Sequence, residues 1–385
     1  MSRPTIRFDR NELAGAFGDM GTDIPLIVGM TLAAGLDGTS VLVMFGAMQI
    51  LTGLVYRLPM PVQPLKAMAA IVIAQQLPAT VLYGAGLAVG VAMLILSASG
   101  LLEWLARSIP KCVVRGIQLG LGLQLASVAL GKYVQSDGVS GYGLALGAFV
   151  VTVLLLGNKR LPAALPVVAL GVLYAVFFEL EGSTLGQSFG FALPQPRLPA
   201  LNDVVTGFLV LALPQIPLSL GNSVLATWQL LRDLFPERSL GIRKLGLTYA
   251  AMNLVNPWFG GIPTCHGSGG LIGHYSFGGR SGGSVIIYGT FFVLAGLFLG
   301  AGFDQVARAF PLPVLGTLLL FESLGLIWMA RDVARSPTEL PVAALVGLLA
   351  GGLPYGYLIG IVVGTLLVRL GARIRLVDPE TAREP

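Results

Sequence analysis

The sequence predicts an all-α polytopic membrane protein with 14 transmembrane segments in a 7+7 inverted repeat, and with half-helices in spans 3 and 10. Its residues are 55% hydrophobic and only 11% charged, and the mean hydropathy is +0.80. An average soluble domain carries about 25% charged residues, so this composition is typical of a chain surrounded by a lipid bilayer. In such a chain the net charge of +5 indicates no nucleic-acid partner. The positive charges instead predict the orientation of the protein, through the side of the membrane on which they lie.

Spanning helices need about 20 mainly apolar residues, and full or partial runs of this kind form two sets. The first set covers residues 12–34, 38–56, 59–77, 80–105, 110–131, 141–157 and 162–180. The second set covers residues 202–231, 241–258, 261–277, 284–301, 304–329, 338–352 and 354–370. The predicted domains are thus residues 1–180 and 201–370, joined by a Pro-rich extracytoplasmic linker, 181–200, and followed by a short cytoplasmic tail, 371–385.

The distribution of basic residues predicts the orientation. With the N-terminus inside, only Lys132, Arg197 and Arg308 of the 24 Lys and Arg residues fall outside, while Lys66 and Arg115 fall within spans. All the others lie in cytoplasmic loops, as expected when basic loops stay on the inner side. We therefore expect a multi-pass protein of the cell (inner) membrane with both termini in the cytoplasm. An odd number of spans per half inserts the second half upside down relative to the first.

Short motifs recur in corresponding spans of the two halves. DIPLIVG, from Asp23, lies in the first span, and QIPLSLG, from Gln215, lies in the eighth. MPVQPLKAMAA, from Met60 in the third span, corresponds to IPTCHGSGGLI, from Ile262 in the tenth. Matches at equivalent places support an internal repeat, the arrangement of many secondary transporters.

The third and tenth spans are predicted to be half extended and half helical. Pro59, Pro61 and Pro64 prevent a helix before about residue 64, and Pro263 does the same before a helix that starts near Gly267. Two helix N-termini would then face each other near the middle of the bilayer. Each presents backbone N–H groups and the positive end of its dipole, which together favour a bound anion.

The tenth span belongs to a stretch from Phe259 to Gly283 in which 10 of 25 residues are glycine. Backbone of this kind is tolerated at membrane depth where it is buried in protein or lines a cavity. Gly267 and Gly269 would let a ligand approach the helix start closely. Cys112 and Cys265 are too few and too scattered for a metal site, and no cofactor is expected.

Uncharged polar side chains are expected at the same depth, beside breaks of the first span at Pro25 and of the eighth span at Pro214 and Pro217. Such donors suit a tetrahedral oxyanion, which accepts many hydrogen bonds and must also be released. The predicted substrate-binding residues are Thr22, Gln63, Lys66, Gln215, Asn222, Ser223, Thr264, Gly267, Ser268 and Gly269.

Ionisable residues within spans are the candidates for coupling transport to an ion gradient. They are Asp19, Asp23, His266 and Glu322. Each has a structural alternative: the two aspartates can brace the first span, the histidine can be a hydrogen-bonded structural residue, and the glutamate can pair with a neighbour or face water. Lys66 near a helix N-terminus opposes the dipole. It fits either a bound anion or a fixed ion pair with Asp19.

Four motifs resemble those of the molybdate transporters related to sulfate permeases. They are GDMGTDIP from Gly18, PMPVQPLKAMAA from Pro59, LPQIPLSLGNSV from Leu213 and CHGSGGLIGHYSFGGRSG from Cys265. The resemblance covers nearly the whole chain and implies the uracil permease and sulfate permease fold, with spans 1–4 and 8–11 as a mobile core and spans 5–7 and 12–14 as a scaffold. It also implies a homodimer through scaffold spans. The short tail implies the molybdate branch, which commonly lacks a cytoplasmic regulatory domain.

The expected function is secondary active transport of molybdate by alternating access, with proton symport as an addition, and no enzymatic activity. A carrier or exchanger for sulfate or another inorganic anion is the first alternative, because helix dipoles do not distinguish tetrahedral dianions. A channel is another alternative. An intramembrane hydrolase using His266, Ser268 and an aspartate is remote, since no nucleophile motif is present.

Overall fold

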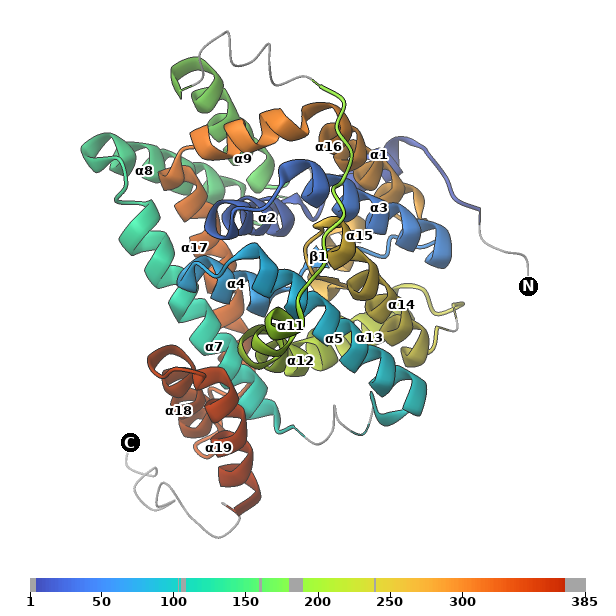
Figure 1. Ribbon diagram of the computed structural model, residues 1–385, viewed down its shortest axis with the longest axis vertical. Helices are drawn as coiled ribbons and strands as arrows, with labels where there is room; N and C mark the ends of the chain where they lie inside the picture. The colour runs from blue at the N-terminus through green and yellow to red at the C-terminus, as the bar shows by residue number, and fades with distance from the viewer. Residues whose placement is uncertain are drawn as a thin grey trace.

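The computed structural model describes residues 5–102, 104, 109–158, 161–179, 190–238 and 240–370, and it is almost entirely helical (Figure 1). Within this part of the chain, seven helices are long and apolar enough to cross a membrane. They run over Gly38–Tyr56, Ala79–Ser99, Lys111–Tyr133, Gly138–Leu155, Leu201–Leu234, Gly283–Gly300 and Leu312–Asp332. Four shorter apolar helices accompany them, at Lys66–Gln75, Ala164–Glu179, Glu339–Gly352 and Gly356–Leu370. The prediction of a helical, multi-pass membrane protein is confirmed.

The first half of the chain forms helices around one short strand. Its elements are α1 (Arg10–Ala16), α2 (Met20–Ala34), α3 (Gly38–Tyr56), β1 (Gln63–Pro64), α4 (Lys66–Gln75), α5 (Ala79–Ser99), α7 (Lys111–Val128), the π-helical η1 (Ala129–Tyr133), α8 (Gly138–Leu155), α9 (Ala164–Tyr174) and the π-helical η2 (Ala175–Glu179). The linker, predicted at 181–200, is described from residue 190 onward, where it is extended.

The second half begins with one long rod made of α11 (Leu201–Gly207), η3 (Phe208–Ala212), α12 (Leu213–Leu218), η4 (Ser219–Ala226) and α13 (Thr227–Leu234). It continues with α14 (Ile242–Val255), the 3₁₀ turn η5 (Asn256–Phe259), β2 (Thr264–Cys265), α15 (Ser268–Ser276), α16 (Gly283–Ala309), α17 (Leu312–Trp328), the 3₁₀ turn η6 (Met329–Asp332), α18 (Glu339–Gly352) and α19 (Gly356–Leu370). The predicted boundary at residues 301–304 was wrong. The helix continues to Ala309, and the next one starts after Pro311.

The half-helices of the third and tenth segments are confirmed. The strands β1 and β2 pair antiparallel, with Gln63 opposite Cys265 and Pro64 opposite Thr264. The helix α4 begins at Lys66, directly after β1, and α15 begins at Ser268, directly after β2. Because the strands run in opposite directions, the two helices leave the pair in opposite senses.

The breaks predicted at Pro25, Pro214 and Pro217 were wrong. The helix α2 continues through Pro25, and the interruption of the first segment lies earlier, between α1 and α2. The segment Leu201–Leu234 is helical over 34 residues. Its two prolines lie next to π-helical turns, η3 and η4, whose wider hydrogen-bonding pattern accommodates the missing N–H groups without ending the helix.

Two helix groups flank the half-helices (Figure 1). On one side α3 packs along α16, and on the other α7 packs against α17 and α18. Both contacts depend on glycine: a Cβ on Gly46 would collide with the backbone of Gly289, and a Cβ on Gly116 would collide with the carbonyl of Ala343. Small residues let membrane helices approach closely and gain van der Waals contact. The helix α4 lies between these two groups.

Candidate functional site

The N-terminus of α4 is covered by a side chain from the long rod. The residue before the helix, Leu65, offers no side-chain cap. Instead the backbone N–H groups of Ala67 and Met68 donate to Gln215 Oε1, at 2.9 and 3.3 Å. The other end of this amide donates to Ser219 Oγ at 3.0 Å. A partly negative oxygen therefore already occupies the position at which the first turn of α4 would hold an anion.

The first residue of α4, Lys66, forms an ion pair with Glu322 of α17. The Lys66 ammonium donates to both carboxylate oxygens, at 2.8 and 3.3 Å, and the two side chains are 23% and 10% exposed. Of the two alternatives for Lys66, the fixed ion pair with Asp19 was therefore wrong, and of the two alternatives for Glu322 the pairing with a neighbour is confirmed. The ion pair joins the half-helix to the α7–α17–α18 group.

Glu322 also lines a cavity of about 500 Å³ between α2, α8, α9 and α17. This cavity includes Gly18 and Gly21 near the start of α2, and it extends to Asn158 and to Ser276 at the end of α15. Asn158 and Ser276 lie near the ends of α8 and α15. The cavity therefore extends from Glu322 to the ends of these two helices.

Asp19 and Gln63 lie next to the start of the other half-helix. Gln63 Nε2 donates to Asp19 Oδ1 at 2.7 Å. The second oxygen, Asp19 Oδ2, is buried without a hydrogen bond and lies where a Cβ on Gly270 would be. Protein oxygens therefore stand close to the first turns of both half-helices, Gln215 at α4 and Asp19 at α15.

Asp23 lies on α2 and is fully buried. Its carboxylate interacts with the hydroxyl of Tyr288 on α16, which is buried as well. A buried carboxylate costs stability unless it is hydrogen-bonded, so Tyr288 is the partner that the described residues offer it.

The two glycines predicted to admit a ligand differ in their surroundings. A Cβ on Gly267 would coincide with Gln63 Oε1, whereas nothing lies within 4 Å of a Cβ on Gly269. Gly267 therefore makes room for the Gln63 side chain. Gly269, which is exposed, leaves open space at the first turn of α15.

This contrast gives a matched pair of substitutions. We expect Gly267→Ala to lower the free energy of unfolding by about 1–3 kcal/mol, because the buried Gln63 must move. We expect Gly269→Ala to leave stability unchanged or to raise it by up to about 1 kcal/mol, because alanine favours a helix. Thermal unfolding of the purified variants in detergent measures both changes. Equal melting temperatures would show that Gln63 does not depend on Gly267.

Asn222 and Ser268 form a second polar contact, with Ser268 Oγ donating to Asn222 Oδ1 at 2.8 Å. Asn222 also lines a cavity of about 200 Å³ that includes Lys111, Arg115 and Gln118 of α7. Asn222 and Ser268 are half-buried, whereas Ser223 is buried beside Cys265. Thr22 is half-buried in the first turn of α2, where its backbone N–H donates to the carbonyl of Asp19 at 3.0 Å.

Thr264 and His266 are fully buried and held by their neighbours. The Asn253 side chain binds both backbone groups of Thr264: it accepts from the N–H at 2.9 Å and donates to the carbonyl at 2.6 Å. His266 contacts Thr248 Oγ1 through Nε2, at 2.7 Å, and the carbonyl of Pro61 through Nδ1, at 3.2 Å. Both ring nitrogens are engaged, and these contacts fit the structural alternative for this histidine.

Sequence reasoning missed the polar residues that hold the crossing strands. Asn253 and Asn256 of the α14–η5 segment bind the backbone of β2 and of Ile262, and Tyr249 contacts Ser219 Oγ at 2.7 Å. Polar residues recurring in an otherwise apolar segment were the available signal. Within the described residues no group of three or more His, Cys, Asp or Glu side chains could hold a metal ion.

The fold is that of solved anion transporters. The transmembrane domain of BicA, a cyanobacterial bicarbonate transporter, matches with a TM-score of 0.69 at 16% identity, over 94% of this chain and 98% of that one. Murine Slc26a9, an anion transporter solved in its inward-facing state, matches with a TM-score of 0.71 at 13% identity, over 96% of this chain and 69% of that one. These similarities establish the class of the protein as a membrane protein of the SLC26 and sulfate permease fold.

The chain belongs to the molybdate transporter family. The model of this family, described as molybdate transporters of the MFS superfamily, matches residues 11–125 and 207–326. Molybdate transporter 2 of Arabidopsis thaliana is 34% identical, over 93% of this chain and 87% of its own length. Molybdate transporter 1 of Chlamydomonas reinhardtii is 27% identical, over 91% and 90% of the two chains. The resemblance of the four motifs is therefore confirmed.

Proposed function

We propose that this protein is a secondary active transporter of molybdate that binds its substrate at the N-terminus of α4. The observation that carries the proposal is the cluster formed by Gln215, Lys66 and Glu322, in which protein oxygens take the place of an anion. The family and the names of its relatives supply molybdate as the oxyanion.

When the substrate binds, its oxygens would replace the protein oxygens of Gln215 and Glu322 as hydrogen-bond acceptors. The incoming oxyanion accepts from the N–H groups of Ala67 and Met68 in place of Gln215, and it accepts from the Lys66 ammonium in place of Glu322. Charge-assisted hydrogen bonds of this kind are stronger than neutral ones. Because internal groups already satisfy these donors, the net gain is moderate, which allows release on the other side of the membrane.

Glu322 is the group that we propose couples binding to a proton. A protonated Glu322 no longer competes for the Lys66 ammonium, and it no longer repels the bound dianion. Proton uptake would then accompany oxyanion binding. Asp19 and Asp23 remain the alternative proton carriers, and His266 is the least favoured because both of its ring nitrogens are engaged.

Transport would proceed by movement of the predicted core, spans 1–4 and 8–11, against the predicted scaffold, spans 5–7 and 12–14. Lys66 belongs to the core and Glu322 to the scaffold, so their ion pair has to break or re-form as the core moves. We propose 14 spans in two inverted halves, with both termini in the cytoplasm of a cell membrane and a homodimer formed through the scaffold. The antiparallel β1–β2 pair and the opposed half-helices support the inverted arrangement.

Uptake of labelled molybdate by proteoliposomes tests this function. We expect saturable uptake that rises when the outside is acidified and that excess sulfate does not abolish. Absence of saturable molybdate uptake, with and without a pH gradient, would contradict the proposal. Equal competition by sulfate would instead favour the broader anion carrier, since cavity size is the physical means of separating the larger molybdate from sulfate.

The hydrolase alternative receives no support from the site. Ser268 Oγ donates to Asn222, while His266 is bound by Thr248 and the carbonyl of Pro61. A serine nucleophile needs a base within hydrogen-bonding reach, and these contacts direct the two side chains to other partners.

Asn222 provides a further test of the site. We expect Asn222→Ala to weaken molybdate binding by about threefold to tenfold, because a neutral hydrogen bond contributes about 0.5–1.5 kcal/mol. The same substitution should leave the melting temperature nearly unchanged, since Asn222 is only half-buried. Unchanged affinity in this variant would remove Asn222 and its partner Ser268 from the binding site.

A further inference from the structure

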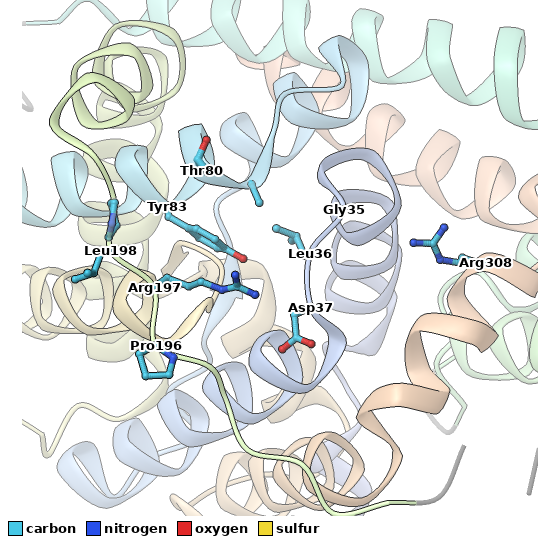
Figure 2. A pocket seen from close by; sticks show the side chains of 11 residues that line it. Gly35, Leu36, Asp37, Thr80, Tyr83, Pro196, Arg197, Leu198 and Arg308 are labelled. Atoms are coloured by element: carbon cyan, nitrogen blue, oxygen red, sulfur yellow. The ribbon is translucent and has the colours of Figure 1, made fainter. Parts of the chain in front are cut away.

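The face crossed by the linker carries a second, basic pocket, whose lining includes neither Lys66 nor Glu322. Its volume is about 620 Å³, and Figure 2 shows its lining. The pocket lies between the turn from α2 to α3, the first turn of α5, linker residues 196–199 and the end of α16. Arg197 and Arg308 reach it from different segments, and Asp37 is the only acidic residue among those that line it.

The described part of the linker, residues 190–200, is held by hydrogen bonds, although it has no regular secondary structure. The backbone N–H of Ala192 donates to the carbonyl of Leu297 at 2.9 Å, and that of Arg197 donates to the carbonyl of Trp258 at 2.7 Å. Between them, the N–H of Gln195 donates to Ser40 Oγ at 3.3 Å. These bonds tie the linker to α16, η5 and α3, so the exposed side chain of Arg197 is held beside the pocket.

Both guanidinium groups are available to a ligand. Neither Arg197 nor Arg308 forms a side-chain hydrogen bond or ion pair with another residue of the described ranges. The carboxylate of Asp37 is engaged in capping α3, where it accepts from the N–H of Ser40 at 2.8 Å. In Figure 2 the Arg197 side chain lies beside the hydroxyl end of Tyr83, and Arg308 extends from the opposite side of the α2–α3 turn.

We propose that this pocket is the first docking site of the transported oxyanion, on the extracytoplasmic side, with Arg197 and Arg308 as its ligands. The inference rests on the proposed function and orientation. A guanidinium presents donors in a planar fork that matches the oxygens of a tetrahedral dianion. Because both side chains are exposed, binding there is weak, and its effect is to raise the local anion concentration and the rate of capture.

The sequence offers a matched control. Lys132 of η1 is exposed, is the third basic residue expected on this face, and does not line the pocket. The experiment measures initial rates of labelled molybdate uptake in intact cells that express the full chain, at low and at physiological ionic strength. The variants are Arg197→Gln, Arg308→Gln, Arg197→Lys and Lys132→Gln, with membrane levels and melting temperatures compared with the parent protein.

We expect Arg197→Gln and Arg308→Gln each to raise the KM for molybdate about threefold to tenfold at low salt, with an unchanged maximal rate. The effect should shrink at higher salt, since the Debye length falls from about 30 Å at 0.01 M to about 8 Å at 0.15 M. Arg197→Lys should lie between Arg197→Gln and the parent, and Lys132→Gln should match the parent. An equal effect in Lys132→Gln, a fall in maximal rate, or no change in KM would overturn the docking site. Absence of uptake by the parent protein would instead refute the proposed function.

Discussion

Glu322→Gln is expected to bind molybdate about tenfold more tightly than the parent protein and to transport it at least about tenfold more slowly. The carboxylate contacts the Lys66 ammonium at 2.8 and 3.3 Å, in the place that we assign to the substrate. Hydrogen bonds to charged groups contribute about 1.5–3 kcal/mol, so removing the competing carboxylate should increase affinity by this order. Tighter binding without proton release then slows discharge of the anion. Isothermal titration gives the affinity, and proteoliposome uptake gives the rate.

The reciprocal substitution, Lys66→Gln, distinguishes competition between Glu322 and the substrate from a purely structural ion pair. Lys66→Gln should lose molybdate affinity by tenfold or more, so the two partners of one ion pair change affinity in opposite directions. A purely structural pair would lower the melting temperature of both variants without opposite changes in affinity, because removing either partner leaves a partly buried charge alone. Glu339→Gln, a change on α18 outside the site, serves as the control. Weaker binding in Glu322→Gln would contradict competition between this carboxylate and the substrate.

Gln215→Glu is expected to abolish measurable molybdate binding, with a loss of a hundredfold or more. A carboxylate at this position accepts the same two N–H groups of α4 and interacts favourably with the helix dipole, by about 0.3–1 kcal/mol or more when partly buried. It would therefore act as a permanent internal anion and repel the substrate. Molybdate-dependent shifts in melting temperature measure the loss.

Gln215→Ala removes the acceptor oxygen from the first turn of α4, whereas Gln215→Glu makes it a charged one. The alanine variant leaves the first turn of α4 uncapped, which should cost about 0.5–2 kcal/mol of stability. The freed N–H groups remain available, so molybdate should still bind and should raise the melting temperature more than it does in the parent protein. Normal molybdate binding by Gln215→Glu, or loss of binding by Gln215→Ala alone, would show that the amide oxygen does not stand in for the substrate.

The helical membrane fold and the two half-helices could be predicted from the sequence because their signals are local. Runs of apolar residues identify the spans, and Pro59, Pro61, Pro64 and Pro263 prevent helix until just before Lys66 and Ser268. The same reasoning failed at Pro25, Pro214 and Pro217, because a proline within a helix can be accommodated by π-helical turns and by neighbouring helices. Whether a proline ends a helix depends on packing that is absent from the local sequence.

The sequence could predict which residues lie in the candidate site, but it could not predict which of their side chains pair with one another. Gln63, Lys66 and Gln215 were expected near the half-helices from their spacing to the prolines, and the structure brings them there. Glu322 lies 256 residues from Lys66, so only the three-dimensional fold shows that it, rather than Asp19, is the partner of this lysine. Likewise, Thr264 and His266 lie within the predicted motif, but only the structure shows that Asn253 and Thr248 are their hydrogen-bond partners.

The number of protons taken up when molybdate binds tests the central claim most directly. Isothermal titration at one pH in buffers of different ionisation enthalpy measures this number for the parent protein, for Glu322→Gln and for Asp23→Asn. We predict about one proton per molybdate for the parent protein and for Asp23→Asn, and none for Glu322→Gln. Proton uptake that persists in Glu322→Gln, or that is absent from the parent protein, would contradict the exchange of the substrate for the carboxylate of Glu322 at Lys66.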